Sequence, residues 1–240
     1  MTDGALIYDG EKKIVVPDCA IRTYADTFVA DEPGSEPLRF KAPKGVRHNQ
    51  DRTVDLIVVH WTASERVGLD GARRTLFNMS ARKDAGCHLL ITNEGTVWQL
   101  ADLTRDMTTH VGHRAVRRRS IGIEVSCQGW VKKGRKMHDL AKAREWYRDK
   151  SQGWRPTMAN FFPEQQDALN RVCVAMSLAL DIPLAVMLDP FRQRSNRKLK
   201  QFQGVIGHVH CSKTKSDPGT KTLQAIDAHY KSITERECSE

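Results

Sequence analysis

The sequence predicts an α/β fold in which helices pack on a central β-sheet. Apolar runs of strand length are interspersed with helix-like segments along a single chain, which is the pattern of this class. The chain has 240 residues with 40% hydrophobic content, enough for one sizeable core. No apolar run approaches the ~20 residues that a transmembrane helix needs. We therefore expect one main domain with extensions and no transmembrane segment.

The N-terminal part, residues 1–50, is predicted to be an extension of a main domain at 51–235. The run IYDGEKKIVV indicates a hairpin that turns at Asp9-Gly10. The first residues contain Asp3 and Glu11 and lack an apolar core, unlike a secretory signal peptide. We therefore expect the protein to be synthesised in a cytoplasm without a signal peptide.

The main domain is predicted to alternate strands and helices. The continuous apolar run VDLIVVH is typical of a strand buried on both faces, and Asn93-Glu94-Gly95 marks a hairpin turn. We expect strands over 54–60, 87–92, 96–100, 120–126 and 205–208. We expect helices over 71–83, 163–180 and 221–233, and an insertion at 128–158 that is partly helical between 138 and 150.

Positive charge is unevenly spread along the chain, whose formal net charge is +9. Residues 132–155 hold nine Lys or Arg against three Asp or Glu. Such clustering indicates an anionic partner, namely nucleic acid, an anionic membrane or an anionic cell wall. A solvated surface that keeps the protein soluble explains the same charge, and both interpretations stay open.

Six cysteines stand at positions 19, 87, 127, 173, 211 and 238 and form no CxxC pair. Without a signal peptide, free thiols are the better interpretation. Cys173 falls in an apolar helical stretch, where we expect a plain core residue.

Two separate segments offer metal ligands. His60 ends an apolar strand, where a single histidine is more often structural. The second segment, GHVHCSKTKSDPG, offers His208 and, nine positions later, Asp217. Two imidazoles and one carboxylate suit Zn²⁺, and three protein ligands leave the fourth position for the water that a hydrolase needs. Asp217 is also placed to cap the helix that follows it.

At this point the sequence resembles a known family. The motifs VVHWTAS, GCHLLITNEGTVWQL, THVGH, SIGIE and GHVHCSKTKSDPG occur in the order seen in zinc-dependent N-acetylmuramoyl-L-alanine amidases. These include phage lysozyme-type amidases, anhydromuropeptide-recycling amidases and peptidoglycan recognition proteins. The resemblance covers residues 53–235 less the insertion. It implies a central mixed β-sheet flanked by helices, and hydrolysis of the lactyl amide of peptidoglycan.

The resemblance also implies roles for particular residues. A carboxylate can take a proton from water and pass it to the leaving amine, and a cation can stabilise the oxyanion. The implied zinc ligands are His60, His208 and Asp217, the implied catalytic residues are Glu124 and Lys215, and His110 is implied to lie near the substrate.

This chain departs from the family pattern in two places. Cys87 stands where many relatives have a tyrosine that assists catalysis, and His210 competes with His208 as a ligand. We expect His208 to be the ligand. Successive strand residues point to opposite faces, so either Cys87 or His88 is expected to be buried. We expect surface positions for His113, His138 and His229.

Several functions are weighed against one another. The main prediction is a phage-type endolysin that reaches the cell wall after release, and the alternative is a cytoplasmic recycling amidase. A non-catalytic peptidoglycan-binding module is a third possibility, although it predicts the loss of a metal ligand. Nucleic acid is an unlikely partner despite the interleaved aromatic residues Trp130, Trp146, Tyr147 and Trp154. We expect a monomer whose substrate is peptidoglycan or a muropeptide, with an anionic cell-wall or outer-membrane surface as a further partner.

Overall fold

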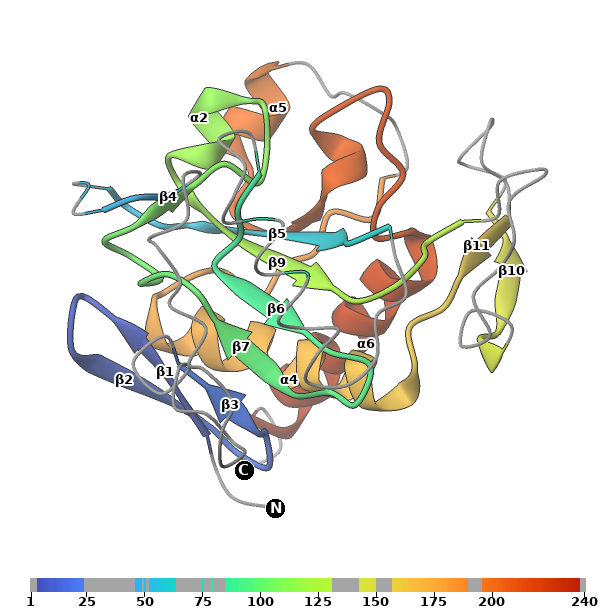
Figure 1. Cartoon of the computed structure of the whole chain (residues 1–240), viewed down its shortest axis with the longest axis horizontal. Helices are drawn as coiled ribbons and strands as arrows, with labels where there is room; N and C mark the ends of the chain where they lie inside the picture. The colour runs from blue at the N-terminus through green and yellow to red at the C-terminus, as the bar shows by residue number, and fades with distance from the viewer. Residues whose placement is uncertain are drawn as a thin grey trace, which may run out of the picture.

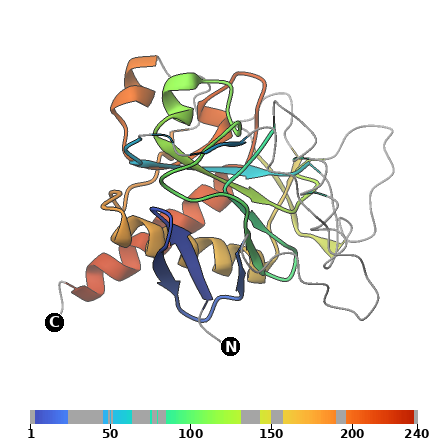
Figure 2. The same cartoon turned by 60° about the vertical axis from the view of Figure 1, so that its left-hand side comes forward.

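The protein is a mixed β-sheet with helices packed on both of its faces, as the computed structural model shows (Figures 1 and 2). The structure describes residues 4–23, 46–48, 50, 52–63, 75, 79, 85–130, 143–149, 157–189 and 196–237. The predicted α/β class with a central mixed sheet is therefore confirmed. No helix among these residues is long and apolar enough to cross a membrane.

The central sheet has six strands in the order β12-β5-β9-β6-β7-β3. Neighbouring strands are parallel except β6 and β7, which form an antiparallel hairpin. The strands are β3 (Ile21–Arg22), β5 (Leu56–Trp61), β6 (Leu89–Ile91), β7 (Val97–Gln99), β9 (Ser120–Val125) and β12 (Gly204–Gly207). Each of the five strands predicted in the main domain has its counterpart here.

The sheet separates two apolar clusters, and β5 contributes to both. Ile57 and Val59 lie in the larger cluster, beneath α4 (Pro163–Ala179) and α6 (Thr220–Glu237). Leu56 and Val58 lie in the smaller cluster, on the side of α2 (Arg114–Arg117) and α5 (Asn196–Gln201). This alternation is the two-residue period of a strand whose two faces are both covered.

The N-terminal hairpin is also confirmed. β1 (Gly4–Tyr8) pairs antiparallel with β2 (Lys12–Val16). Asp9 and Gly10 both have positive φ, as a tight hairpin turn requires. Leu6, Ile14 and Val16 belong to the larger cluster, and β3 joins the central sheet. The proposed division between an extension at 1–50 and a main domain remains a prediction.

In the segment expected to be partly helical between 138 and 150, Ala143 is helical and a strand follows it. β10 (Trp146–Arg148) pairs antiparallel with β11 (Thr157–Ala159). This strand, in which aromatic residues form a pleated, half-buried surface and Tyr147 faces Met158 across the pair, was not predicted from the sequence. The remaining short elements are the pair β4 (Val46–Arg47) and β8 (Met107–Thr108) and the 3₁₀ turn η2 (His208–His210).

The long helices follow the sequence prediction closely. α4 and α6 cover the spans expected over 163–180 and 221–233. Of the helix expected over 71–83, only Thr75 and Met79 are described, and both are helical. The rest of that span lies outside the described residues.

Candidate metal and catalytic site

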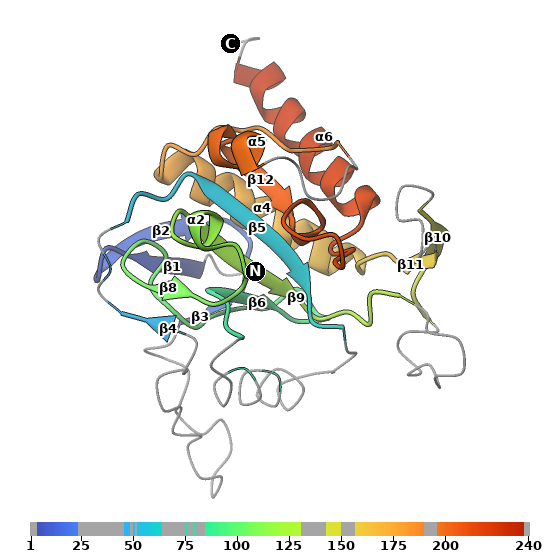
Figure 3. The ribbon, with the colours of Figure 1, turned by 90° about the horizontal axis from the view of Figure 1, so that it is seen from above.

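The strands β5, β9 and β12 end along one edge of the sheet (Figure 3). His60 on β5 pairs in register with Glu124 on β9, and His208 directly follows β12. Both β12 and β9 run parallel to β5, so their carboxyl ends meet at the same edge. His60 follows Leu56 and Val58 at every second position of β5, so its side chain lies on the same face of the sheet as theirs, the α2 side. Glu124 pairs with His60 and lies on that face too.

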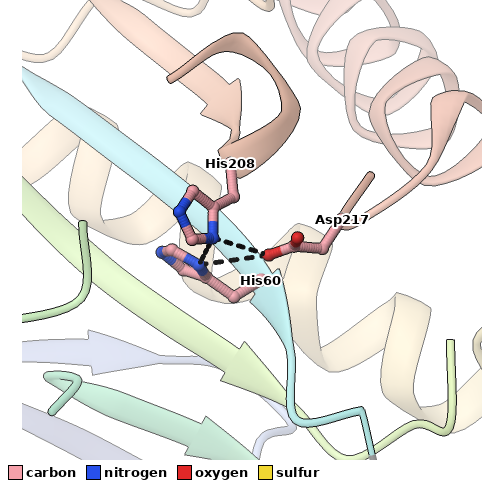
Figure 4. A group of neighbouring side chains, drawn as sticks. All are labelled: His60, His208 and Asp217. Carbon is pink, nitrogen blue, oxygen red and sulfur yellow. Dashed lines mark hydrogen bonds and ion pairs between the residues drawn. The ribbon is translucent and has the colours of Figure 1, made fainter. Parts of the chain in front are cut away.

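Three side chains converge on one point at this edge (Figure 4). His60 Nδ1 lies 2.9 Å from His208 Nδ1 and 3.2 Å from Asp217 Oδ2. His208 Nδ1 lies 3.0 Å from the same carboxylate oxygen. All three residues are buried, and among the described residues they are the group that could hold a metal.

The turn after β12 brings Asp217 back to the histidines. Val209 N–H donates to the backbone oxygen of Asp217 at 2.9 Å, so the loop closes on η2. The closure is tight at Gly207, where a Cβ would lie 2.6 Å from Pro218 Cδ and 3.0 Å from the Asp217 oxygen. A residue with a side chain at position 207 would therefore push the loop outward.

The geometry and charge of this group fit zinc. A tetrahedral zinc ion with bonds of ~2.0–2.1 Å separates its ligand atoms by about 3.3 Å, close to the 2.9–3.2 Å found here. Burial, together with the neighbouring His208, lowers the pKa of His60 to about 4, so its nitrogen lone pair is free at neutral pH. Burial raises the pKa of Asp217, but the two histidines outweigh it and the net shift is downward.

Glu124 stands beside this group with an atom that no other described group satisfies. Its Oε2 is buried and has no hydrogen-bond partner among the described residues. Burial is the main cause that raises the pKa of Glu124 well above its ordinary value, the Asp217 carboxylate adds to the rise, and Lys215 opposes it. A carboxyl group with a raised pKa can accept and return a proton near neutral pH.

Lys215 and His110 differ in their exposure to solvent and in their contacts with the metal group. Lys215 is exposed on the loop before Asp217, and its charge lowers the pKa values of both His60 and Glu124. His110 is buried, and its ring meets that of His60 edge-on with centroids 5.6 Å apart. The His110 ring nitrogens lie 2.8 Å from the hydroxyls of Thr108 and Ser120. Contact between His110 and substrate stays a prediction.

His210 is turned away from the metal group. Its Nδ1 accepts from the Gly207 N–H at 3.0 Å, and its Nε2 lies 2.9 Å from the Asp189 carbonyl oxygen. This placement supports His208 as the ligand of the two.

The expectation that only one of Cys87 and His88 is buried is wrong, because both are buried. Both faces of the sheet are covered here, so neither direction leads to solvent. His88 has a structural position that its motif did not reveal, since its Nδ1 accepts the Gly122 N–H at 2.9 Å beneath His110.

The remaining histidines and the cysteines have simpler outcomes. The His113 ring accepts the Val116 N–H at the start of α2; His113 and His229 are both half-buried, and His138 lies outside the described residues. The free-thiol prediction is confirmed for the cysteines at 19, 87, 127, 173 and 211, all of them buried. Cys238 lies outside the described residues.

Sequence reasoning missed two buried charged residues of the insertion, Arg144 and Asp149. Arg144 bonds to Asn93, 51 positions away, and Asp149 bonds to Thr220, 71 positions away. No local pattern can reveal contacts of that separation. The two residues lie in a stretch whose charges otherwise suggested a solvated surface.

Comparison with known proteins shows the family to which this chain belongs. A family model described as N-acetylmuramoyl-L-alanine amidase matches residues 50–220. The chain belongs to this family, and it is an N-acetylmuramoyl-L-alanine amidase. No curated protein matches it in sequence.

Solved structures share the fold. The catalytic domain of XlyA is 19% identical, with a TM-score of 0.50 over 89% of this chain and 98% of its own. A mutant endolysin from Bacillus subtilis is also 19% identical, with a TM-score of 0.50 over 90% and 99%. The amidase AmiD from E. coli, in complex with an anhydromuropeptide, is 19% identical over 75% and 60%, with a TM-score of 0.47.

Proposed function

We propose that this amidase is zinc-dependent and that it hydrolyses the lactyl amide between N-acetylmuramic acid and L-alanine. His60 Nδ1, His208 Nδ1 and Asp217 Oδ2 would hold the metal. One observation carries the proposal: these three atoms lie within 3.2 Å of one another in a buried group at the edge of the sheet. The neutral state of His60, the charged state of Asp217 and the separations of the three atoms all suit Zn²⁺.

The residues around the metal group supply the remaining chemistry. When bound, Zn²⁺ would act as a Lewis acid and lower the pKa of water to ~7. Glu124, with its raised pKa, takes a proton from the attacking water and passes it to the leaving amine. Lys215 offers its ammonium group to the negative charge that develops on the carbonyl oxygen.

The ligand assignment is tested with two neighbouring histidines. His208→Ala removes one of the three converging atoms and should abolish stoichiometric zinc and muropeptide turnover. His210→Ala is the matched control, because both ring nitrogens of His210 are hydrogen-bonded to backbone groups of Gly207 and Asp189 and not to the metal group. It should keep both. Zinc content by elemental analysis decides the test: loss of zinc in His210→Ala but not in His208→Ala contradicts the assignment.

We further propose a phage-type endolysin that acts on the cell wall after release, with the domain at 51–235 working as a monomer. The net charge of +9 supports it, since positive charge favours anionic walls and outer-membrane surfaces. The alternative is a recycling amidase for anhydromuropeptides, which the aspartate in the third ligand position favours by family resemblance.

These two roles make opposite predictions about substrate size. An endolysin digests intact sacculi at a rate comparable with its rate on soluble muropeptide. A recycling amidase cleaves soluble anhydromuropeptide and leaves sacculi intact. Release of free stem peptide from both substrates, measured side by side, distinguishes them. A protein that binds muropeptide with zinc present and releases no peptide from either substrate would be the third alternative, a non-catalytic binding module.

A further inference from the structure

The described part of the predicted insertion forms a compact unit beside the start of α6. We call residues 143–149 and 157–159 the insertion hairpin; β10 and β11 lie at the right of Figure 1. It contacts the segment that follows β9, where Trp130 bridges to Met158 and Ala159 N–H donates to the Gly129 oxygen at 2.9 Å. The hairpin therefore has a fixed attachment to the core sheet.

One end of the hairpin caps α6. The buried Asp149 carboxylate accepts the Thr220 hydroxyl at 2.9 Å and the Thr220 backbone N–H at 3.3 Å. The first turn of α6 contains no acidic residue of its own. A carboxylate at a helix N-terminus satisfies free N–H groups and interacts favourably with the helix dipole. Asp149 thus supplies, from the insertion, an acidic group that the first turn of α6 does not contain.

Tyr147 holds the residues on either side of Thr220. Its hydroxyl lies so close to Gly219 that a Cβ at that position would clash with it. The ammonium of Lys221 lies 4.9 Å from the Tyr147 ring centroid and 3.5 Å from Glu145 Oε1. The three residues held in this way, 219–221, follow Asp217 by two to four positions.

Arg144 fixes the other end of the hairpin to the sheet. It is 4% exposed, and its Nη2 donates to the Ser126 oxygen at 2.9 Å and to Asn93 Oδ1 at 3.1 Å. Its guanidinium also lies 3.9 Å from the Phe162 ring centroid. Ser126 is two residues beyond Glu124. The insertion hairpin therefore contacts the chain close to Glu124 through Arg144 and close to Asp217 through Asp149.

We propose that the insertion hairpin is a brace that sets the position of Asp217 relative to the sheet edge, with Asp149 and Tyr147 as positioning residues. The inference rests on the proposed zinc function. Asp149 acts by holding the first residue of α6, and through it the turn that ends in the third ligand. Removing this support should let Asp217 move away from His60 and His208, which remain fixed to β5 and β12.

The test measures zinc affinity in the full chain. Asp149→Ala should weaken zinc binding ~10- to 100-fold, the range seen when a group that orients a metal ligand is lost. Asp149→Asn should restore most of the affinity, because asparagine also caps helices well. Thr220→Val, which loses only the hydroxyl donor, should fall between wild type and Asp149→Ala. Affinity is measured by competition with a chromophoric chelator, alongside the melting temperature of the metal-free protein.

A matched control separates positioning from stability. Ser177→Ala removes the buried 2.9 Å hydrogen bond to Tyr230, ten residues along the same helix from Thr220. It should lower the melting temperature and leave zinc affinity unchanged. If Asp149→Ala behaves in the same way, the brace is only structural and the inference is wrong. If Asp149→Ala does not fold, Thr220→Val decides the test: a Thr220→Val protein with wild-type zinc affinity would also show that the inference is wrong.

The two levels of proposal fail in different ways. A wild-type protein that takes up no stoichiometric zinc overturns the proposed zinc function. A wild-type protein that binds zinc, with an Asp149→Ala variant of equal affinity, overturns only the brace.

Discussion

Burial decides the chemistry of Glu124 more than any single neighbour does. Removal from water is the first cause of its raised pKa, and the Asp217 carboxylate is the second. The sequence motif located this residue, and the strand register explains why it stands beside His60. What the motif could not indicate is that Oε2 is a buried acceptor without a partner in the described structure, since that depends on how the strands are covered.

Glu124→Gln should leave zinc content intact and lower muropeptide turnover by ~10²-fold or more, because positioned acid–base groups contribute 10²–10⁴-fold. The amide keeps the shape of the side chain and loses its ability to accept the proton. Glu235→Gln, on the exposed end of α6, is the control for the chemical change. Near wild-type turnover in Glu124→Gln would exclude Glu124 as the base.

His88 gives a prediction about acid stability that does not involve the metal. Burial, followed by the charge of Arg52, lowers the pKa of His88 to about 3, while an unfolded histidine titrates near 6.5. Below about pH 6.5, His88 binds a proton in the unfolded chain but stays neutral in the folded protein. The free energy of unfolding therefore falls as the pH drops from 6.5 towards 3. The slope is about 1.4 kcal/mol per pH unit for this group.

Replacing His88 should flatten that pH dependence. His88→Gln removes the titrating ring, and denaturant unfolding of the metal-free protein between pH 7 and 4 would report a shallower slope than wild type. Thr108→Val is the control, since it removes the hydroxyl 3.2 Å from His88 Nδ1 without removing a titrating group. It should lower stability and keep the slope. Equal slopes in wild type and His88→Gln would contradict the assigned cause.

Among the elements, the turn from β12 into η2 leaves no room for a side chain at Gly207. Gly207→Ala places a methyl group 2.6 Å from Pro218 Cδ. Overpacking of this kind costs about 1–3 kcal/mol, and it should displace the Asp217 turn and weaken zinc binding. Gly112→Ala is the control, because a Cβ there meets nothing within 4 Å. A stable Gly207→Ala protein with unchanged zinc affinity would show that the turn accommodates the methyl group elsewhere.

Elements with a strong local pattern were predictable from the sequence, and elements set by distant partners were not. The apolar run of β5, the hairpin at Asn93-Glu94-Gly95 and the proline that begins α4 each carry a local physical cause. The strand β10 was missed because it forms by pairing with β11, about ten residues further along the chain. The sequence between and around the two strands is highly charged, and that charge hid the strand pattern. The order of strands in the sheet also depends on long-range packing, and it was not predicted from the sequence.

For the molecule as a whole, the proposed endolysin role predicts that the uneven positive charge strengthens attachment to the cell wall. Replacing Lys132, Lys133, Arg135 and Lys136 by alanine lowers the net charge from +9 to +5. These positions lie outside the described residues, and the prediction rests on their charge alone. Activity on whole cell walls should fall more than activity on soluble muropeptide, since the latter depends on short-range chemistry. Raising salt to ~0.5 M should narrow the difference by screening.

A second variant with the same loss of charge tests whether location matters. Alanine at Lys12, Lys13, Lys231 and Arg236 also gives +5, and these side chains are exposed on β2 and α6. An equal fall in wall activity for both variants would mean that net charge matters and the location of the insertion does not.

The backbone hydrogen bond between Val209 and Asp217 provides a local reporter of zinc release. Its N–H must stay protected from solvent deuterium for as long as the loop remains closed over the histidines. A ligand on a loop can leave the metal only when that closure opens, whereas ligands attached to strands stay in place. Under conditions in which every opening of this hydrogen bond leads to exchange, we therefore expect the exchange rate of the Val209 amide to set an upper limit on the rate at which the proposed zinc ion is released to excess chelator. The metal would then stay in the protein at least as long as this one peptide hydrogen bond persists.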